Sequence, residues 1–190
     1  GEVLVLFIAV MLNIDTPLLP IHILWINLVT DSLPALALSF DPAAKDLMRR
    51  KPIDPTQGIM TRGFSLRLLL QGACIATLVL IANRIGAQTS LDAARTMTFA
   101  VLAFSQITII FSIRSGMHWA GNGFFSNGFL WGAVLSVVAL MSVVLFVPAV
   151  QSIFHVCSLS GVQWMWVVGL SLGAMVLSEI AKLIVRLARR

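Results

Sequence analysis

The sequence predicts an all-α fold, a polytopic bundle of transmembrane helices, and two observations lead to this prediction. The first is composition: 58% of the 190 residues are hydrophobic and only 11% are charged, whereas about a quarter of the residues of a soluble domain carry charge. The second is the grouping of apolar residues into runs of about 20, the length that crosses the hydrocarbon core of a bilayer. A soluble helix would show a polar stripe along such a run.

We expect one partial and five full spans. The partial span covers residues 3–12 and is followed by a short linker with two prolines, 13–20. The full spans are expected at 21–39, 64–87, 95–113, 128–150 and 164–187, with polar loops at 40–63, 114–127 and 151–163. The chain opens inside an apolar run without a methionine, so we expect residues 1–190 to be a fragment of a longer protein.

The basic residues indicate an orientation and not a nucleic-acid partner. The net charge is +5, but no stretch interleaves basic residues with aromatic side chains for base stacking. Loops rich in Lys and Arg face the cytoplasm. We therefore expect a cytoplasmic C-terminus and a first segment that enters from the cytoplasmic side. Eleven of the 13 basic residues lie in or beside two alternate loops and the C-terminus: Lys45, Arg49, Arg50, Lys51, Arg62, Arg67, Arg114, Lys182, Arg186, Arg189 and Arg190.

The second span differs from the others because it carries polar residues near the middle of the bilayer. Asn27, Thr30 and Asp31 fall within one arc of about 100° around a helix. A carboxylate at this depth costs at least about 2.5–3.5 kcal/mol on insertion scales, so it is rarely accidental. Carboxylates inside a membrane commonly belong to a proton relay, an ion pathway or a buried ion pair.

Pro34 predicts a break in the same span. Its ring lacks an N–H and clashes with the carbonyl four residues back, that of Thr30. We expect the helix to kink or unwind near Thr30–Pro34, which would leave a carbonyl beside the polar stripe, as in the broken helices that bind ions near the midplane. The alternative is a proline kink whose polar groups bond to neighbouring helices.

Two further residues are candidates for the same site. Glu2 opens the first segment at a depth that matches Asp31 on an antiparallel neighbour, and Gln106 lies inside the fourth span. The alternatives are a solvated carboxylate for Glu2 and a helix-to-helix hydrogen bond for Gln106. All five side chains offer oxygen, which suits Ca²⁺, Mg²⁺, Mn²⁺ or alkali ions rather than copper or zinc. Ca²⁺ takes about 6–8 oxygens, so other helices are expected to contribute.

The stretch LLPIHILWINLVTDSLPALALSFDPAAKDLMRRKP closely resembles the sixth transmembrane helix and following cytoplasmic loop of type II P-type ATPases. The match is best to the sarco/endoplasmic-reticulum type and its bacterial relatives. Their motif reads NLVTDGLPA, so Ser32 stands in place of a glycine. The opening GEVLVLF resembles the end of their fifth helix and SEIAKLIVR resembles their tenth, so the resemblance covers the whole chain. The NLVTD-x-LPA block is specific, whereas the other helices agree mainly in hydropathy and loop placement.

The resemblance implies a role for each candidate residue. Glu2 matches the fifth-helix glutamate that coordinates calcium. Asn27, Thr30 and Asp31 match the sixth-helix ligands, and Asp31 matches the aspartate shared between two calcium sites. Gln106 falls where the reticulum pump has an eighth-helix glutamate and the plasma-membrane calcium pump has glutamine. The 40–63 loop matches one that contacts the phosphorylation domain.

The implied function is that of the C-terminal membrane domain, residues 1–190, of an ATP-driven pump in a bacterial plasma membrane. It would bind Ca²⁺ and export it by alternating access, with protons carried back by the carboxylates. Because Gln106 lacks the charge of a glutamate, we expect one Ca²⁺ per cycle. The family's DKTG motif, nucleotide-binding domain, TGES loop and first four helices are not within these 190 residues. ATP and Mg²⁺ are therefore expected to act only in the full-length pump, and this chain alone should be inactive. Its expected partners are the lipid bilayer and the remaining domains and helices of the pump, with no nucleic acid.

Three other interpretations stay open at this point. The first is a related pump for Mn²⁺ or Na⁺. The second is a passive channel or half of a secondary transporter, which needs no ATP. The third is a membrane scaffold that transports nothing. The sequence preceding residue 1 would separate the pump from the second.

Overall fold

The computed structural model describes residues 2–14, 16–41, 62–118 and 127–187, and its regular elements there are all helices. Five of the helical stretches are long and apolar enough to cross a membrane, and a sixth, shorter apolar helix precedes them. The prediction of an all-α bundle with one partial and five full spans is confirmed.

The first segment packs against the long helix α4 (Arg62–Ala87) and is joined to the second segment by a short linker. Helix α1 (Glu2–Met11) ends beside Asn13, which adopts a left-handed conformation with φ of 51°, a geometry that asparagine tolerates. The second span is one continuous rod of 19 residues, Pro20–Leu38. It consists of α2 (Pro20–Trp25), the π-helix η1 (Ile26–Asp31) and α3 (Ser32–Leu38).

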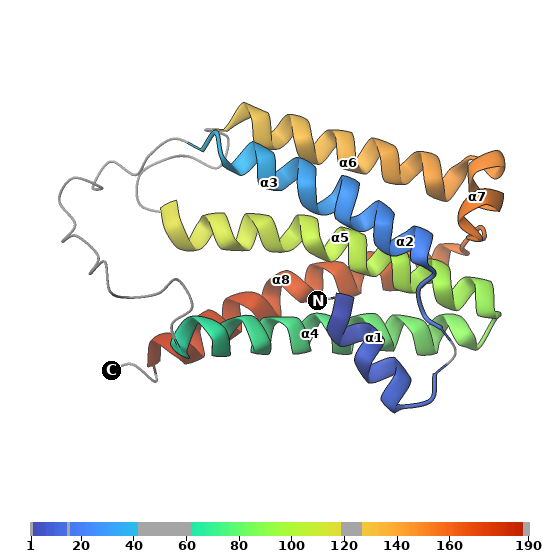
Figure 1. The fold of residues 1–190 in the computed structure, drawn as a ribbon, viewed down its shortest axis with the longest axis horizontal. Helices are drawn as coiled ribbons and strands as arrows, with labels where there is room; N and C mark the ends of the chain where they lie inside the picture. The colour runs from blue at the N-terminus through green and yellow to red at the C-terminus, as the bar shows by residue number, and fades with distance from the viewer. Residues whose placement is uncertain (1, 15, 42–61, 119–126, 188–190) are drawn as a thin grey trace.

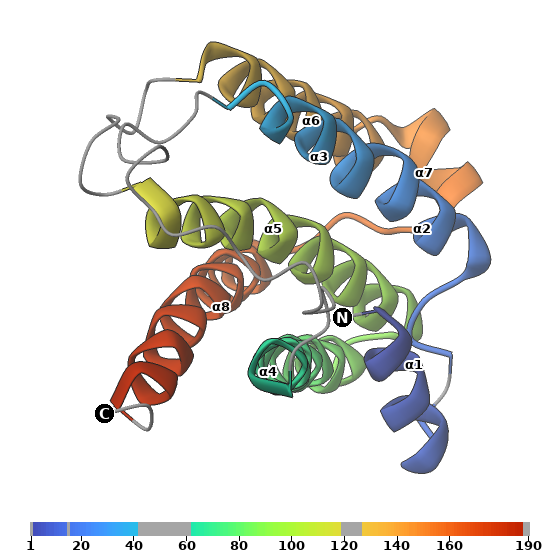
Figure 2. The same ribbon diagram turned by 60° about the vertical axis from the view of Figure 1, so that its left-hand side comes forward.

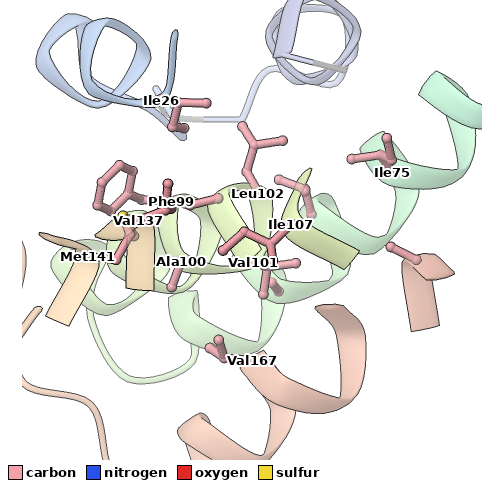
Figure 3. Close-up of a cluster of buried hydrophobic side chains, with 14 of the residues drawn as sticks. Ile26, Ile75, Phe99, Ala100, Val101, Leu102, Ile107, Val137, Met141 and Val167 are labelled. Atoms are coloured by element: carbon pink, nitrogen blue, oxygen red, sulfur yellow. The ribbon is translucent and has the colours of Figure 1, made fainter. Parts of the chain in front are cut away.

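Three long helices form the best-packed part of the bundle: α4 (Arg62–Ala87), α5 (Leu91–His118) and α8 (Gly161–Leu187). Helix α5 lies between the α4–α8 pair and the second span (Figures 1 and 2). Its residues 99–103 are all fully buried. Figure 3 shows Phe99 and Leu102 of α5 between Ile26 of the second span and Val167 of α8. This central helix therefore fixes where the second span lies.

The fifth span is shorter than expected. Helix α6 (Gly128–Phe146) ends before residue 150, and a separate short helix, α7 (Pro148–Phe154), follows. The reason is Pro148, because a proline disfavours the helical conformation of the residue before it. Val147 is accordingly extended, with φ of −89° and ψ of 114°.

Two spans begin earlier than expected because polar residues cap them. Ser90 accepts a hydrogen bond from the Ala93 amide at 3.0 Å, so α5 starts at Leu91. Ser160 and Gln163 exchange side-chain and backbone hydrogen bonds of 3.3 and 2.8 Å. This reciprocal pattern is a capping box, and it starts α8 at Gly161.

Successive spans run in opposite directions, so the ends of α3, α5 and α8 lie together with the starts of α4 and α6 (Figure 1). This alternation agrees with the predicted loop placement. Most of the 40–63 loop lies outside the described residues, as do Lys45, Arg49, Arg50, Lys51, Arg189 and Arg190. The side chains of Arg62, Arg67, Arg114, Lys182 and Arg186 lie outside them as well.

Candidate cation-binding site

The disruption of the second span takes the form of a π-helix and begins one turn earlier than Thr30–Pro34. The wide turns cover Ile26–Asp31, and Pro34 itself lies inside the regular helix α3. A wider turn relieves the clash between the proline ring and the Thr30 carbonyl while it keeps backbone groups bonded. Opening the helix would leave those groups unpaired in a bilayer. Single turns of π-helix occur often at functional sites.

The polar side chains of the π-helix bond to the backbone around it. Thr30 Oγ1 donates to the Ile26 carbonyl at 2.9 Å, and Ser32 Oγ donates to the Asn27 carbonyl at 2.6 Å. Thr30 is fully buried, so its hydroxyl belongs to the packed side of the helix. The Ser32 hydroxyl thus adds a side-chain donor to a backbone carbonyl of the wide turns.

Glu2 meets the polar stripe directly. Asn27 Nδ2 donates to Glu2 Oε2 at 3.1 Å and to the Ile23 carbonyl at 3.0 Å. The second carboxylate oxygen of Glu2, Oε1, is buried and has no hydrogen-bond partner within the described part of the chain. Burying a charged oxygen without a partner is costly, so a cation would find uncompensated negative charge here.

Asp31 lies one turn beyond Asn27, half-buried. Its carboxylate is close enough to that of Glu2 for the two charges to repel each other. The amide hydrogens of Asn27 face one of these carboxylates, which partly offsets the charge. For the oxygen of Asn27 to bind a cation, this amide would have to rotate.

Gln106 lies at the same depth but is not bonded to the other candidates. Phe99 of α5 stacks on His22 of α2 with ring centroids 4.7 Å apart, and the two helices run in the same direction (Figure 1). Gln106 follows Phe99 by seven residues on α5, and Val29 follows His22 by seven residues on the second span. Seven residues of helix rise by about 10 Å, so Gln106 is expected at about the depth of Val29. Gln106 is half-buried, and no hydrogen bond joins it to Glu2, Asn27, Thr30 or Asp31 among the contacts that the structure describes.

Among the described contacts, the structure therefore joins Glu2 to Asn27 by a hydrogen bond, lets the Asp31 charge act on Glu2, and turns the Thr30 side chain to its own helix, whereas Gln106 is not bonded to any of them. Within residues 2–14, 16–41, 62–118 and 127–187, no group of three or more His, Cys, Asp or Glu side chains gathers around a single point. Two carboxylates and the neighbouring amide and hydroxyl oxygens fall short of the roughly 6–8 oxygens that Ca²⁺ takes.

Two buried polar residues at the ends of the second span were not singled out by the sequence. His22 is fully buried at the start of α2, and Asn127 is 3% exposed at the start of α6. The signal that could have found Asn127 is its place directly before Gly128 and the apolar run, which is typical of a helix N-cap. A histidine two residues after the proline that opens a span gives a weaker signal.

Comparison with known proteins gives a consistent result. The family described as "Cation transporting ATPase, C-terminus" matches residues 15–184. A Calcium-transporting ATPase of Bacillus subtilis is 39% identical over 90% of this chain and 20% of its own length. One from Listeria monocytogenes is 35% identical over 97% of the chain and 21% of its own length. The mouse Calcium-transporting ATPase type 2C member 2 is 31% identical over 90% of the chain and 18% of its own length. The chain thus spans about a fifth of the length of these relatives.

Proposed function

This chain belongs to the family of cation-transporting ATPase C-terminal regions, and from that premise we propose that residues 1–190 form part of the membrane domain of an ATP-driven Ca²⁺ exporter. Calcium is the transported substrate. ATP hydrolysis, with its Mg²⁺, belongs to other parts of the full-length pump, and the 190 residues alone are inactive. The first four helices of that pump complete the coordination shell.

The observation that supports this proposal most directly is the contact between Asn27 and Glu2. A hydrogen bond of 3.1 Å brings a carboxylate from α1 onto the polar stripe of a second helix. Asp31 adds a second negative charge beside it. A membrane interior tolerates such a concentration of charge where it serves ions or protons. Two carboxylates neutralise one divalent cation, which matches one Ca²⁺ per cycle.

The proposed mechanism is alternating access. With the site open to the cytoplasm, Glu2, Asp31 and the rotated amide of Asn27 bind Ca²⁺ through oxygen, and Gln106 adds a neutral oxygen donor from α5. Phosphorylation elsewhere in the pump shifts the helices and lowers the affinity of the site. Ca²⁺ leaves toward the outside, and the two carboxylates take up protons that they carry back. The pump resides in a bacterial plasma membrane with its C-terminus in the cytoplasm.

The test uses the full-length pump in inside-out vesicles or proteoliposomes supplied with ATP. We expect ATP-dependent Ca²⁺ uptake with one Ca²⁺ per ATP hydrolysed, together with alkalinisation of the vesicle interior as protons leave. Two Ca²⁺ per ATP would refute the stoichiometry. Uptake without ATP would favour a channel or secondary transporter. ATP hydrolysis that Mn²⁺ or Na⁺ stimulates and Ca²⁺ does not would contradict Ca²⁺ as the substrate.

A further inference from the structure

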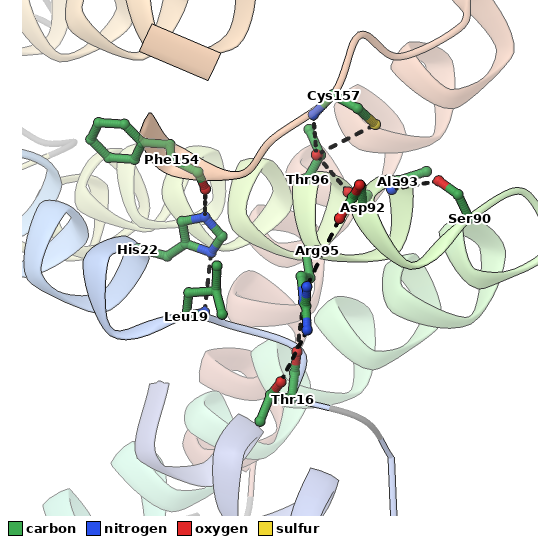
Figure 4. A network of polar contacts seen from close by, with 10 residues as sticks. All are labelled: Thr16, Leu19, His22, Ser90, Asp92, Ala93, Arg95, Thr96, Phe154 and Cys157. Carbon is green, nitrogen blue, oxygen red and sulfur yellow. Dashed lines mark hydrogen bonds and ion pairs between the residues drawn. The ribbon is translucent and has the colours of Figure 1, made fainter. Parts of the chain in front are cut away.

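The second span is held at one end by a fully buried histidine. His22 Nδ1 accepts a hydrogen bond of 3.2 Å from the Leu19 amide, and His22 Nε2 lies 2.7 Å from the Phe154 carbonyl (Figure 4). Because Nδ1 accepts, the proton of the neutral ring is on Nε2, which donates to that carbonyl. Phe154 is the last residue of α7, and its ring packs edge-to-face against the Trp25 ring with centroids 5.1 Å apart. The start of α2 is thereby fixed to the end of α7.

The other end of the second span is held by Asn127. Its Nδ2 donates to the Ala37 carbonyl and to Asp41 Oδ1, both at 3.1 Å, and its Oδ1 accepts from the Leu130 amide at 3.0 Å. One buried side chain thus caps α6 and is hydrogen-bonded to the end of α3. Phe40 stacks on Phe129 beside it, with centroids 4.9 Å apart.

The π-helix is the irregular stretch between these two attachments. A π-turn amounts to one residue inserted into an α-helix. Converting Ile26–Asp31 to a regular α-helix would therefore move one end of the span relative to the other by about 1.5 Å and about 100°. Such a shift cannot occur while His22 and Asn127 fix both ends to α6–α7, which packs along the span.

We propose that α6–α7 is a clamp that keeps the second span π-helical at Asn27 and Asp31, and that His22 and Asn127 are positioning residues for cation binding. This inference rests on the proposed function. No hydrogen bond in the described part of the chain joins either residue to Glu2, Asn27 or Asp31, so each acts through the geometry of the helix. Releasing either end lets the π-turn relax and moves the oxygens of Asn27 and Asp31 away from Glu2.

The test compares variants that cut the attachment but keep the fold. Asn127→Asp retains an oxygen that caps α6 but has no amide hydrogen for the Ala37 carbonyl. His22→Phe keeps a ring against Phe99 and loses both hydrogen bonds, whereas His22→Gln keeps one donor and one acceptor. In the full-length pump we expect the first two to raise the half-saturating Ca²⁺ concentration of ATP hydrolysis by about three- to tenfold. The maximal rate should change less, and His22→Gln should restore the wild-type value.

A matched control loses a buried hydrogen bond outside the clamp. Asn83→Ala removes the 3.1 Å bond from Asn83 Nδ2 to Thr98 Oγ1 between α4 and α5, and its half-saturating Ca²⁺ concentration should stay at the wild-type value. Wild-type half-saturation in both His22→Phe and Asn127→Asp would overturn the clamp and leave the pump proposal standing. An equal shift in Asn83→Ala would also overturn it, because the effect would then be general destabilisation.

Hydrogen exchange at residues 26–31 gives a readout that does not depend on transport. The clamp predicts that His22→Phe and Asn127→Asp change the exchange rates of these amides in the full-length protein, whereas Asn83→Ala leaves them unchanged. Unaltered exchange in both clamp variants would contradict the proposal even if the wild-type protein moved no Ca²⁺. Absence of Ca²⁺ transport by the wild-type protein would contradict the pump proposal and not the clamp.

Discussion

Two regions of this bundle differ in whether all their buried polar side-chain atoms find a partner. In the α4–α5–α8 group, polar side chains bond to one another or to backbone: Asn83 to Thr98, Ser112 to Ser178 and Glu179, and Thr108 to the Ser171 carbonyl. In the α1–α2–η1 region, the described residues leave two buried side-chain atoms without a partner, Glu2 Oε1 and Trp25 Nε1. Satisfied polar groups hold helices together, whereas unsatisfied charge inside a membrane marks a functional site.

The difference also appears in packing. The contrast lies in the central helix: 67% of the hydrophobic stretch of α5 is buried inside the bundle, against 33% for α4, 28% for α8 and 33% for the second span. The α4–α5 turn is so close that a Cβ on Gly86 would lie 2.5 Å from Ala94 Cα. We call the α4–α5–α8 group the scaffold, since its α4–α5 turn has little room for change. The α1–α2–η1 region instead holds a buried carboxylate oxygen without a partner among the described residues. Four substitutions test this division.

Asp31→Asn should have the largest effect, because it removes one of the two charges that would neutralise Ca²⁺ and barely changes the size of the side chain. We expect ATP-dependent Ca²⁺ uptake by the full-length pump to fall to the level of vesicles without pump, while the amount of folded protein stays normal. Uptake at the wild-type rate would mean that the polar stripe is structural, as in the scaffold.

Glu2→Gln should have the next largest effect. The amide can still accept from Asn27 Nδ2, so the contact between α1 and η1 survives, but the buried charge is lost. Since about 1.4 kcal/mol of lost attraction is a factor of ten in affinity, we expect the half-saturating Ca²⁺ concentration to rise about tenfold or more. Titration of ATP hydrolysis with Ca²⁺ measures it. An unchanged titration would place Glu2 outside the site.

Gly86→Ala should damage the scaffold and spare the site. The added methyl would overlap the backbone of Ala93 and Ala94, and overpacking of this kind costs about 1–3 kcal/mol. We expect a lower thermal midpoint in detergent and a wild-type half-saturating Ca²⁺ concentration for the protein that folds. A changed Ca²⁺ titration with an unchanged midpoint would reverse the assignment of the two regions.

Asn83→Ala should have the smallest effect, because one interhelical hydrogen bond in a membrane protein contributes about 0.6 kcal/mol on average. We expect a slight decrease in the thermal midpoint. A loss of stability larger than that of Gly86→Ala would show that the α4–α5 contact depends on this bond and not on close backbone packing.

The sequence was sufficient for the spans and for the approach of Glu2 to the polar stripe. Apolar runs follow from hydropathy alone, and the short linker after residue 12 makes the first two segments neighbours. The sequence did not predict that the disruption of the second span takes the form of a π-helix. Pro34 predicts a clash with the Thr30 carbonyl, but whether the chain unwinds or widens depends on what holds its two ends.

Those attachments join residues far apart in the chain, which explains why local patterns did not predict them. His22 and Phe154 are separated by 132 positions, and Asn127 and Ala37 by 90. The end of the fifth span, by contrast, was readable from a local signal, because Pro148 divides an otherwise continuous apolar run. Metal-ligand roles for Glu2, Asn27, Thr30, Asp31 and Gln106 stay predictions, because the side chains that the described contacts bring together offer fewer oxygens than the roughly 6–8 that Ca²⁺ takes.

The most direct test of the account is equilibrium binding of radioactive Ca²⁺ to the purified full-length pump without ATP. The account predicts one Ca²⁺ per wild-type molecule, loss of that binding in Asp31→Asn, and full binding in Asn83→Ala. Unchanged binding in Asp31→Asn would contradict the claim that Ca²⁺ docks on the π-helix beside Glu2.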